Sequence, residues 1–190
     1  MKKSFGAKTL VYPTPVWLIG TYDKQGNPDA ATVAWSGVCS SQPPAVAVSL
    51  RKSRYTYENI MERKAFTVNV PSAGQVVIAD YCGIVSGRDT DKFAAAKITA
   101  VKSEKVDAPY IKEFPMIIEC TLLNYVDTGI HTHFIGEIVD VKIDESVLRE
   151  DGLPAFSKIN PILYGPEIQS YFDVGKCLGK AFSIGKKINK

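Results

Sequence analysis

Short apolar segments separated by turn signals run through the first half of the chain and predict β-strands. Alternating apolar and small residues, rich in β-branched members, are typical of half-buried strands. The predicted strands span residues 16–22, 30–35, 45–50 and 65–70. A turn at residues 23–28 joins the first two strands, and a connection this short implies antiparallel pairing.

Three helices are predicted between the strands. They span residues 57–64, 74–81 and 94–96. Thr56 precedes the first helix and is expected to cap it, because its hydroxyl can accept a bond from a first-turn N–H. Gly83 is expected to end the second helix.

The second half of the chain returns to longer strands. Residues 116–125 and 131–143 are predicted strands with a turn at 127–129, and the proline-containing stretch 158–171 is expected to be loop and short strand. Many short strands with a few helices predict a mainly β fold, a closed antiparallel barrel that carries peripheral α-helices.

Composition is consistent with one domain over residues 1–190, with room for a small helical appendage. Hydrophobic residues make up 45% of the chain, which is enough for a substantial core. The net charge of +3 is too weak to indicate a nucleic-acid partner. No apolar run has the length of a membrane span, and the first residues lack a secretory signal pattern. The sequence therefore predicts a cytoplasmic protein with no membrane partner.

The cysteines do not form a metal or redox motif. Cys39, Cys82, Cys120 and Cys177 lie far apart and include no C-x-x-C pair. This spacing disfavours a zinc ribbon, a thioredoxin-type dithiol and an iron–sulfur cluster. We predict reduced thiols packed in the core. Contact of Cys39 with a bound ring is the alternative for that residue.

Several common site types are absent from the sequence. It contains no G-x-G-x-x-G, Walker, H-E-x-x-H or G-x-S-x-G pattern. The two histidines, His131 and His133, would point to the same face of a strand, but no third metal ligand follows nearby. We predict no metal site, with one histidine in contact with a ligand and the other packed or facing solvent.

A basic, hydroxyl-rich loop connects the third predicted strand with the first helix. It contains Arg51, Lys52, Ser53 and Arg54. Cationic side chains, hydroxyls and the free N–H groups of a helix start are the groups that bind phosphate. A solvated loop with no ligand is the other interpretation of the same residues.

Eight motifs in order give the chain a recognisable resemblance. They are P-x-P-V-x-L-I-G-T at 13–21, D-x-x-G-N at 23–27, W-S-G-V-C-S-S-x-P-P-x-V-x-V-S at 35–49, R-x-x-x-x-T-x-x-N-I at 51–60, F-x-V-N-V at 66–70 with D-K-F at 91–93, G-x-H-x-x-F-x-G-x-I at 129–138, and N-P-I-L-Y-G at 160–165. With this order and spacing, the chain resembles the flavin reductase-like family, which has the FMN-binding split-barrel fold.

The resemblance implies a fold, an assembly and a cofactor site. The implied fold is a six-stranded antiparallel split β-barrel of Greek-key type, in a homodimer with one FMN per subunit near the interface. The backbone of one segment would border the isoalloxazine ring: Trp35, Ser36, Gly37, Val38, Cys39, Ser40 and Ser41. Four residues would hold the phosphate: Arg51, Ser53, Arg54 and Thr56. Lys92 would add positive charge, and His131 and Tyr164 would face the ring or the nicotinamide.

The resemblance also implies a function. FMN would take electrons from NADH or NADPH, or from a redox protein partner, and pass them to an acceptor. The flavin carries this chemistry, so no catalytic residue is certain, and His131 is expected only as a contact. Two alternatives stay open: an FMN electron carrier served by protein partners alone, and a redox-inactive barrel that binds haem or another phosphate ester.

Overall fold

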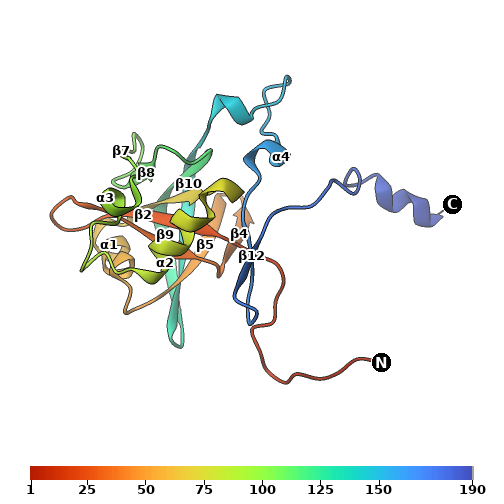
Figure 1. Ribbon diagram of the computed structural model, residues 1–190, viewed down its shortest axis with the longest axis horizontal. Helices are drawn as coiled ribbons and strands as arrows, with labels where there is room; N and C mark the ends of the chain where they lie inside the picture. The colour runs from red at the N-terminus through yellow and green to blue at the C-terminus, as the bar shows by residue number, and fades with distance from the viewer. Residues whose placement is uncertain (190) are drawn as a thin grey trace.

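Seven strands form one curved antiparallel sheet, shown in Figure 1 for the computed structural model, which describes residues 1–189. The strands, in spatial order, are β3 (Pro28–Val33), β2 (Trp17–Tyr22), β6 (Ala65–Val70), β9 (Met116–Thr128), β10 (His131–Ile143), β5 (Pro44–Arg51) and β4 (Ser36–Ser41). The expected number was six. The sheet is mainly β and antiparallel as predicted, and β3 and β4 are its two edges.

Most strand predictions are confirmed. β6 and β10 have the predicted bounds, β2, β3 and β5 agree within two residues at each end, and β9 extends three residues beyond its prediction to Thr128. β4 was not predicted, because its sequence, SGVCSS, is rich in small and polar residues with little β-propensity. Pairing with β5 holds this edge strand in place.

The first helix, α1 (Tyr55–Arg63), begins two residues earlier than predicted. Arg54 is its N-cap residue and makes no side-chain cap bond. The predicted capping role of Thr56 is therefore wrong. Its buried hydroxyl instead donates a hydrogen bond to Asp29 Oδ2, at 2.9 Å, on β3. A tertiary partner far away in sequence has replaced the local cap.

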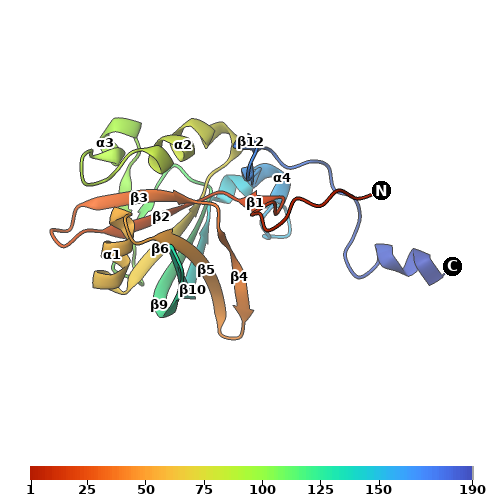
Figure 2. The ribbon, with the colours of Figure 1, turned by 90° about the horizontal axis from the view of Figure 1, so that it is seen from below.

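Two further helices cover one face of the sheet (Figure 2). The 3₁₀ turn η1 (Ala73–Gln75) leads into α2 (Val76–Ile84), which continues through Gly83 rather than ending there. α3 (Lys92–Ala96) starts earlier than predicted, and the Asp91 carboxylate caps it by accepting the N–H of Ala94 at 3.0 Å.

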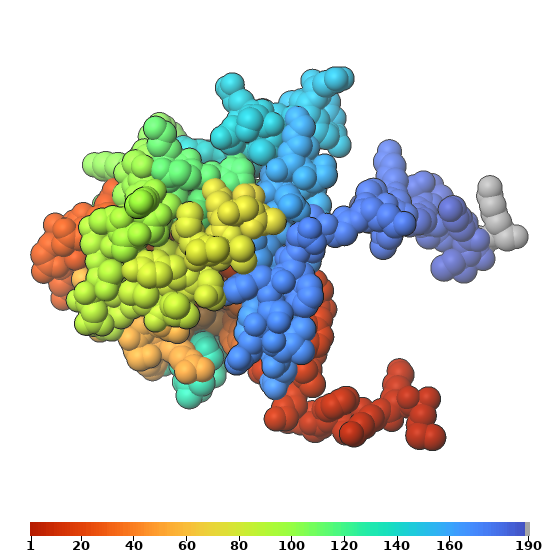
Figure 3. Space-filling model, in the orientation of Figure 1, coloured from red at the N-terminus to blue at the C-terminus, as the bar shows by residue number. Residues whose placement is uncertain are grey.

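Smaller elements complete the chain. They are β1 (Thr14–Pro15), β11 (Leu163–Gly165) and β12 (Ser170–Phe172) in one sheet, β7 (Ala100–Lys102) and β8 (Pro109–Ile111) in another, and η2 (Glu145–Val147), α4 (Phe156–Ile159) and η3 (Ile184–Asn189). The proline-rich stretch is loop and short strand as predicted, with α4 in addition. Both ends of the chain project from the body as arms, visible in Figure 3. Among residues 1–189, no helix is long and apolar enough to cross a membrane.

The core consists of two main clusters on opposite faces of the sheet. Ile19, Phe66 and Phe134 belong to the cluster that the sheet encloses. Leu18, next to Ile19 on β2, points the other way and joins the cluster beneath α2 and α3. Consecutive strand residues alternate between faces, so both faces of β2 are buried. This explains why the strand is almost continuously apolar.

Close packing inside the enclosed cluster requires Gly136 on β10. A Cβ added there would overlap the ring of Phe66 and would lie 3.0 Å from Cys120 Cβ. We expect Gly136→Ala to lower the free energy of unfolding by about 1–3 kcal/mol, the usual cost of an overfilled core. Urea denaturation measures this change. Gly37→Ala on β4, where nothing lies within 4 Å, is the matched control and should change stability little. Equal stability of both variants would contradict the packing argument.

The core prediction for the cysteines is half right. Cys82 and Cys120 are buried, and burial raises the pKa of their thiols to about 11 and about 12. Both are therefore unreactive. Cys39 and Cys177 are exposed, because β4 is an edge strand and residue 177 lies outside the helices and strands, after β12.

Candidate functional site

Two adjoining cavities lie between β3, β5 and α2. The larger has a volume of about 370 Å³ and the smaller about 160 Å³. Both are lined by Thr32, Leu50, Arg51, Arg54 and Gly83, so they share a wall. The larger volume falls within the range of roughly 300–1,000 Å³ that small-molecule sites occupy. Together they offer a wide compartment with a narrow extension.

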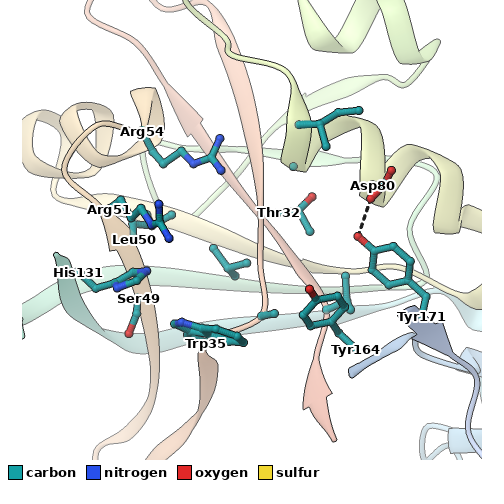
Figure 4. Close-up of a pocket in the computed structure, with 15 residues that line it drawn as sticks. Thr32, Trp35, Ser49, Leu50, Arg51, Arg54, Asp80, His131, Tyr164 and Tyr171 are labelled. Carbon is teal, nitrogen blue, oxygen red and sulfur yellow. Dashed lines mark hydrogen bonds between the residues drawn. The ribbon is translucent and has the colours of Figure 1, made fainter. Parts of the chain in front are cut away.

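Several aromatic side chains line the wide compartment (Figure 4). Trp35 comes from the bend between β3 and β4, and Tyr164 and Tyr171 come from β11 and β12. The Tyr164 and Tyr171 rings have centroids 5.6 Å apart and are tilted by 49°. Trp35, Tyr164 and His131 are predicted site residues that the fold brings together. A planar aromatic ligand suits such walls.

Hydroxyl and cationic groups line the narrow compartment. Arg51, Ser53, Arg54 and Thr56, the four predicted phosphate residues, all border it. Ser86 and Gly87, from the loop after α2, also border it. The fold therefore brings the complete predicted set to one small volume.

Arg51 and Arg54 differ from the neighbouring cations. Their guanidinium groups form no ion pair or side-chain hydrogen bond with residues 1–189, although both line the junction of the two compartments. By contrast, Lys52 pairs with Asp127 at 2.8 Å and Arg88 pairs with Glu58 at 2.6 Å. Unpaired guanidinium groups have all their donors available, and guanidinium geometry matches phosphate.

A buried ion pair borders the narrow compartment. Lys92 and Asp29 are each 3% exposed, and Lys92 Nζ lies 3.0 Å from Asp29 Oδ1. Lys92 also donates to the carbonyl oxygen of Ala30 at 2.7 Å, and Thr56 donates to the other carboxylate oxygen of Asp29. Lys92 thus borders the compartment in which a phosphate is expected, but Asp29 neutralises its charge. The net positive charge of the compartment comes from Arg51 and Arg54.

The β4 residues beyond Trp35 lie away from both compartments. Ser36, Gly37, Val38, Cys39, Ser40 and Ser41 line neither cavity. Val38 is 76% exposed and Cys39 is exposed, so the predicted packing of Cys39 in the core is wrong. Ser36 Oγ, next to Trp35, is buried without a hydrogen-bond partner in residues 1–189. It is a polar atom that a ligand or water would have to satisfy.

The two histidines have different surroundings. His131 stands opposite Arg51 in the β10–β5 register and lines the wide compartment. His133 Nδ1 lies 2.7 Å from Ser49 Oγ, so this histidine is held by the protein. Among the described residues, no group of three His, Cys, Asp or Glu side chains could hold a metal ion.

The pKa of His131 is lowered, first by burial and then by the positive charge of Arg51. The folded protein thus binds this proton at lower pH than the unfolded chain does, so protonation favours unfolding. We expect the free energy of unfolding to fall, relative to His131→Gln, as pH decreases from 7 to 5. Urea titrations of both proteins across that window measure the difference. An unchanged difference would show that His131 does not titrate in the way its surroundings indicate.

Sequence reasoning missed Thr32, Asp80 and Tyr171 in the wide compartment. Thr32 Oγ1 donates to Ala79 O at 2.5 Å, and Tyr171 donates its hydroxyl proton to Asp80 Oδ1 at 2.8 Å. Asp80 and Tyr171 are 91 residues apart in the chain, and no local pattern marks either of them. Only the docking of β12 beside α2 brings them together.

Comparisons with known proteins agree with this geometry. The model of the flavin reductase like domain family matches residues 9–167. The flavoredoxin of Desulfovibrio vulgaris (Miyazaki F) is 55% identical, with a TM-score of 0.94 over 98% of this chain and 100% of that one. The flavoredoxin of Methanosarcina acetivorans is 32% identical, with a TM-score of 0.92 over 99% of both chains.

The fold is that of a split barrel. A structure with a split barrel domain from Shewanella frigidimarina NCIMB 400 is 24% identical, with a TM-score of 0.83 over 96% of this chain and 100% of that one. The motif resemblance to the flavin reductase-like family is confirmed by the family model and by the two flavoredoxin structures.

Proposed function

We propose that this chain, which belongs to the flavin reductase like domain family, binds FMN and passes electrons from a donor through it to an acceptor. One observation carries the proposal: two unpaired guanidinium groups stand where an aromatic compartment meets a narrow, hydroxyl-lined one. A ligand with a planar ring and a phosphate tail matches both compartments. When bound, FMN supplies two-electron and one-electron redox chemistry.

The residues of the chain bind and orient the cofactor. Arg51 and Arg54 would hold the phosphate through charge-assisted hydrogen bonds, with Ser53 at the same compartment. Thr56 donates its proton to Asp29 and so supports the helix start rather than acting as a free donor. Trp35 and Tyr164 would exclude water from the ring.

The donor proposed is NADH or NADPH. Anaerobic addition of either nucleotide to FMN-loaded protein should bleach the yellow absorbance of the flavin. Failure with both nucleotides, together with bleaching by reduced ferredoxin, would favour the electron-carrier function instead. A colourless protein whose melting temperature does not change with FMN would leave only the redox-inactive alternative. Release and identification of any flavin in the purified protein complete the test.

We also propose a homodimer. Four apolar side chains of β9 and β10 are exposed, Leu123, Tyr125, Val139 and Val141, each at least 41% exposed. Exposed large apolar side chains are a feature of protein–protein interfaces. Light scattering after size exclusion would give the mass directly, and a monomer at micromolar concentration would contradict the proposal. A single domain and a cytoplasmic location stay predictions.

A further inference from the structure

The wide compartment has opposite charges at its two ends. Arg51, Arg54 and His131 lie at one end, and Asp80 lies at the other, as Figure 4 shows. Asp80 is the only carboxylate among the residues that line this compartment. It is exposed on α2 and forms no ion pair with residues 1–189. Its negative charge is therefore not cancelled by the protein.

Two tyrosine rings accompany this carboxylate. Tyr164 and Tyr171 face each other across β11 and β12 in the strand register, with ring centroids 5.6 Å apart. The Tyr171 hydroxyl donates to Asp80 Oδ1 at 2.8 Å and holds the carboxylate beside the rings. Burial and this bond to Asp80 raise the pKa of Tyr171, so the phenol remains a donor at neutral pH.

A carboxylate next to aromatic faces is a binding arrangement for organic cations. The face of an aromatic ring carries partial negative charge and attracts a cation within about 6 Å. A planar cation can stack on one ring while the carboxylate compensates its charge. Because the other end of the compartment is positive, the same cation is repelled there, and only the Asp80 end accepts it.

We propose that Asp80, Tyr164 and Tyr171 form a subsite for a planar aromatic cation, an N-alkylated pyridinium such as an oxidised nicotinamide ring. This inference rests on the proposed function, and it names the residues that would bind the electron donor. When a dihydronicotinamide gives up a hydride, its C4–H bond breaks with the electron pair, the acceptor gains the hydride, and the ring becomes a pyridinium cation. A fixed carboxylate favours that developing charge.

Equilibrium binding of a matched pair of probes tests the subsite. The probes are 1-methylnicotinamide, which is a cation, and nicotinamide, which has the same ring without the charge. Isothermal titration is carried out on the purified protein with its flavin content recorded. We expect the wild-type protein to prefer the cation by about fivefold at low salt, which is typical of a partly exposed charge contact. Raising the salt concentration should weaken binding of the cation only.

Three variants separate the subsite from general effects of charge. Asp80→Asn should abolish the preference for the cation and leave nicotinamide binding unchanged. Tyr171→Phe keeps the ring, frees the carboxylate and should reduce the preference partially. Glu104→Gln removes one exposed carboxylate that borders neither compartment, and it should keep the wild-type preference.

The proposal is overturned if the wild-type protein binds the two probes equally, binds neither, or keeps its preference in Asp80→Asn. If a variant does not fold, the salt dependence of cation binding to the wild-type protein still tests the subsite. Flavin-free protein is titrated in parallel. Loss of FMN binding would sink the proposed function and leave the cation preference measurable, so the two failures can be told apart.

Discussion

We expect the double variant Arg51→Ala with Arg54→Ala to bind FMN about a hundredfold more weakly than the wild type. Each guanidinium that borders the narrow compartment lacks a carboxylate partner, so each can give its donors to a phosphate. A hydrogen bond between charged groups contributes about 1.5–3 kcal/mol, and each 1.4 kcal/mol changes affinity tenfold. The lower end applies to exposed side chains such as these. Fluorescence titration of FMN-free protein measures the affinity.

Riboflavin, which lacks the phosphate, provides the specific readout. The wild type should bind FMN much more tightly than riboflavin, and the double variant should bind both with similar affinity. Lys52→Ala is the matched control. Lys52 lies between the two arginines in sequence, but its charge pairs with Asp127 and it lines neither compartment. Equal FMN affinity in wild type and double variant would remove the phosphate assignment.

We expect Asp29→Ala to cause the largest loss of stability of any substitution discussed. Asp29 and Lys92 form an ion pair from which water is almost excluded, at 3% exposure on each side. Removing the carboxylate leaves the Lys92 cation buried without a counter-charge and takes the acceptor away from Thr56. Breaking a buried pair costs about 3–5 kcal/mol, which corresponds to about 6–20 °C in melting temperature for a chain of this size.

An exposed aspartate–lysine ion pair with partners of the same residue types is the control. Asp127 also binds a lysine, Lys52, and a threonine hydroxyl, that of Thr132, but both members of the pair are more than half exposed. Asp127→Ala should therefore change the unfolding free energy little. The double variant Asp29→Asn with Lys92→Met should be more stable than Asp29→Ala, because it buries no unpaired charge. Similar losses in Asp29→Ala and Asp127→Ala would contradict this account.

The strands could be predicted from the sequence where burial imposes a pattern of apolar side chains. β6 and β10 have their predicted bounds because their side chains alternate between faces that the fold fills. β4 was not predicted because an exposed edge strand imposes no such pattern. The cap at Thr56 was predicted wrongly because its hydroxyl binds Asp29, a residue distant in the chain. The seventh strand and the ends of helices thus depend on contacts that are distant in the chain.

The candidate site, too, was predicted from the sequence in part only. The sequence by itself determined the cationic loop with Arg51 and Arg54 and the family to which the chain belongs. Ordered motifs and local charge can be recognised without knowledge of the fold. Only the tertiary structure decided which charges remain available. It placed Asp29 against Lys92 and Asp80 beside Tyr171, because strand register and helix docking join residues that no local pattern connects.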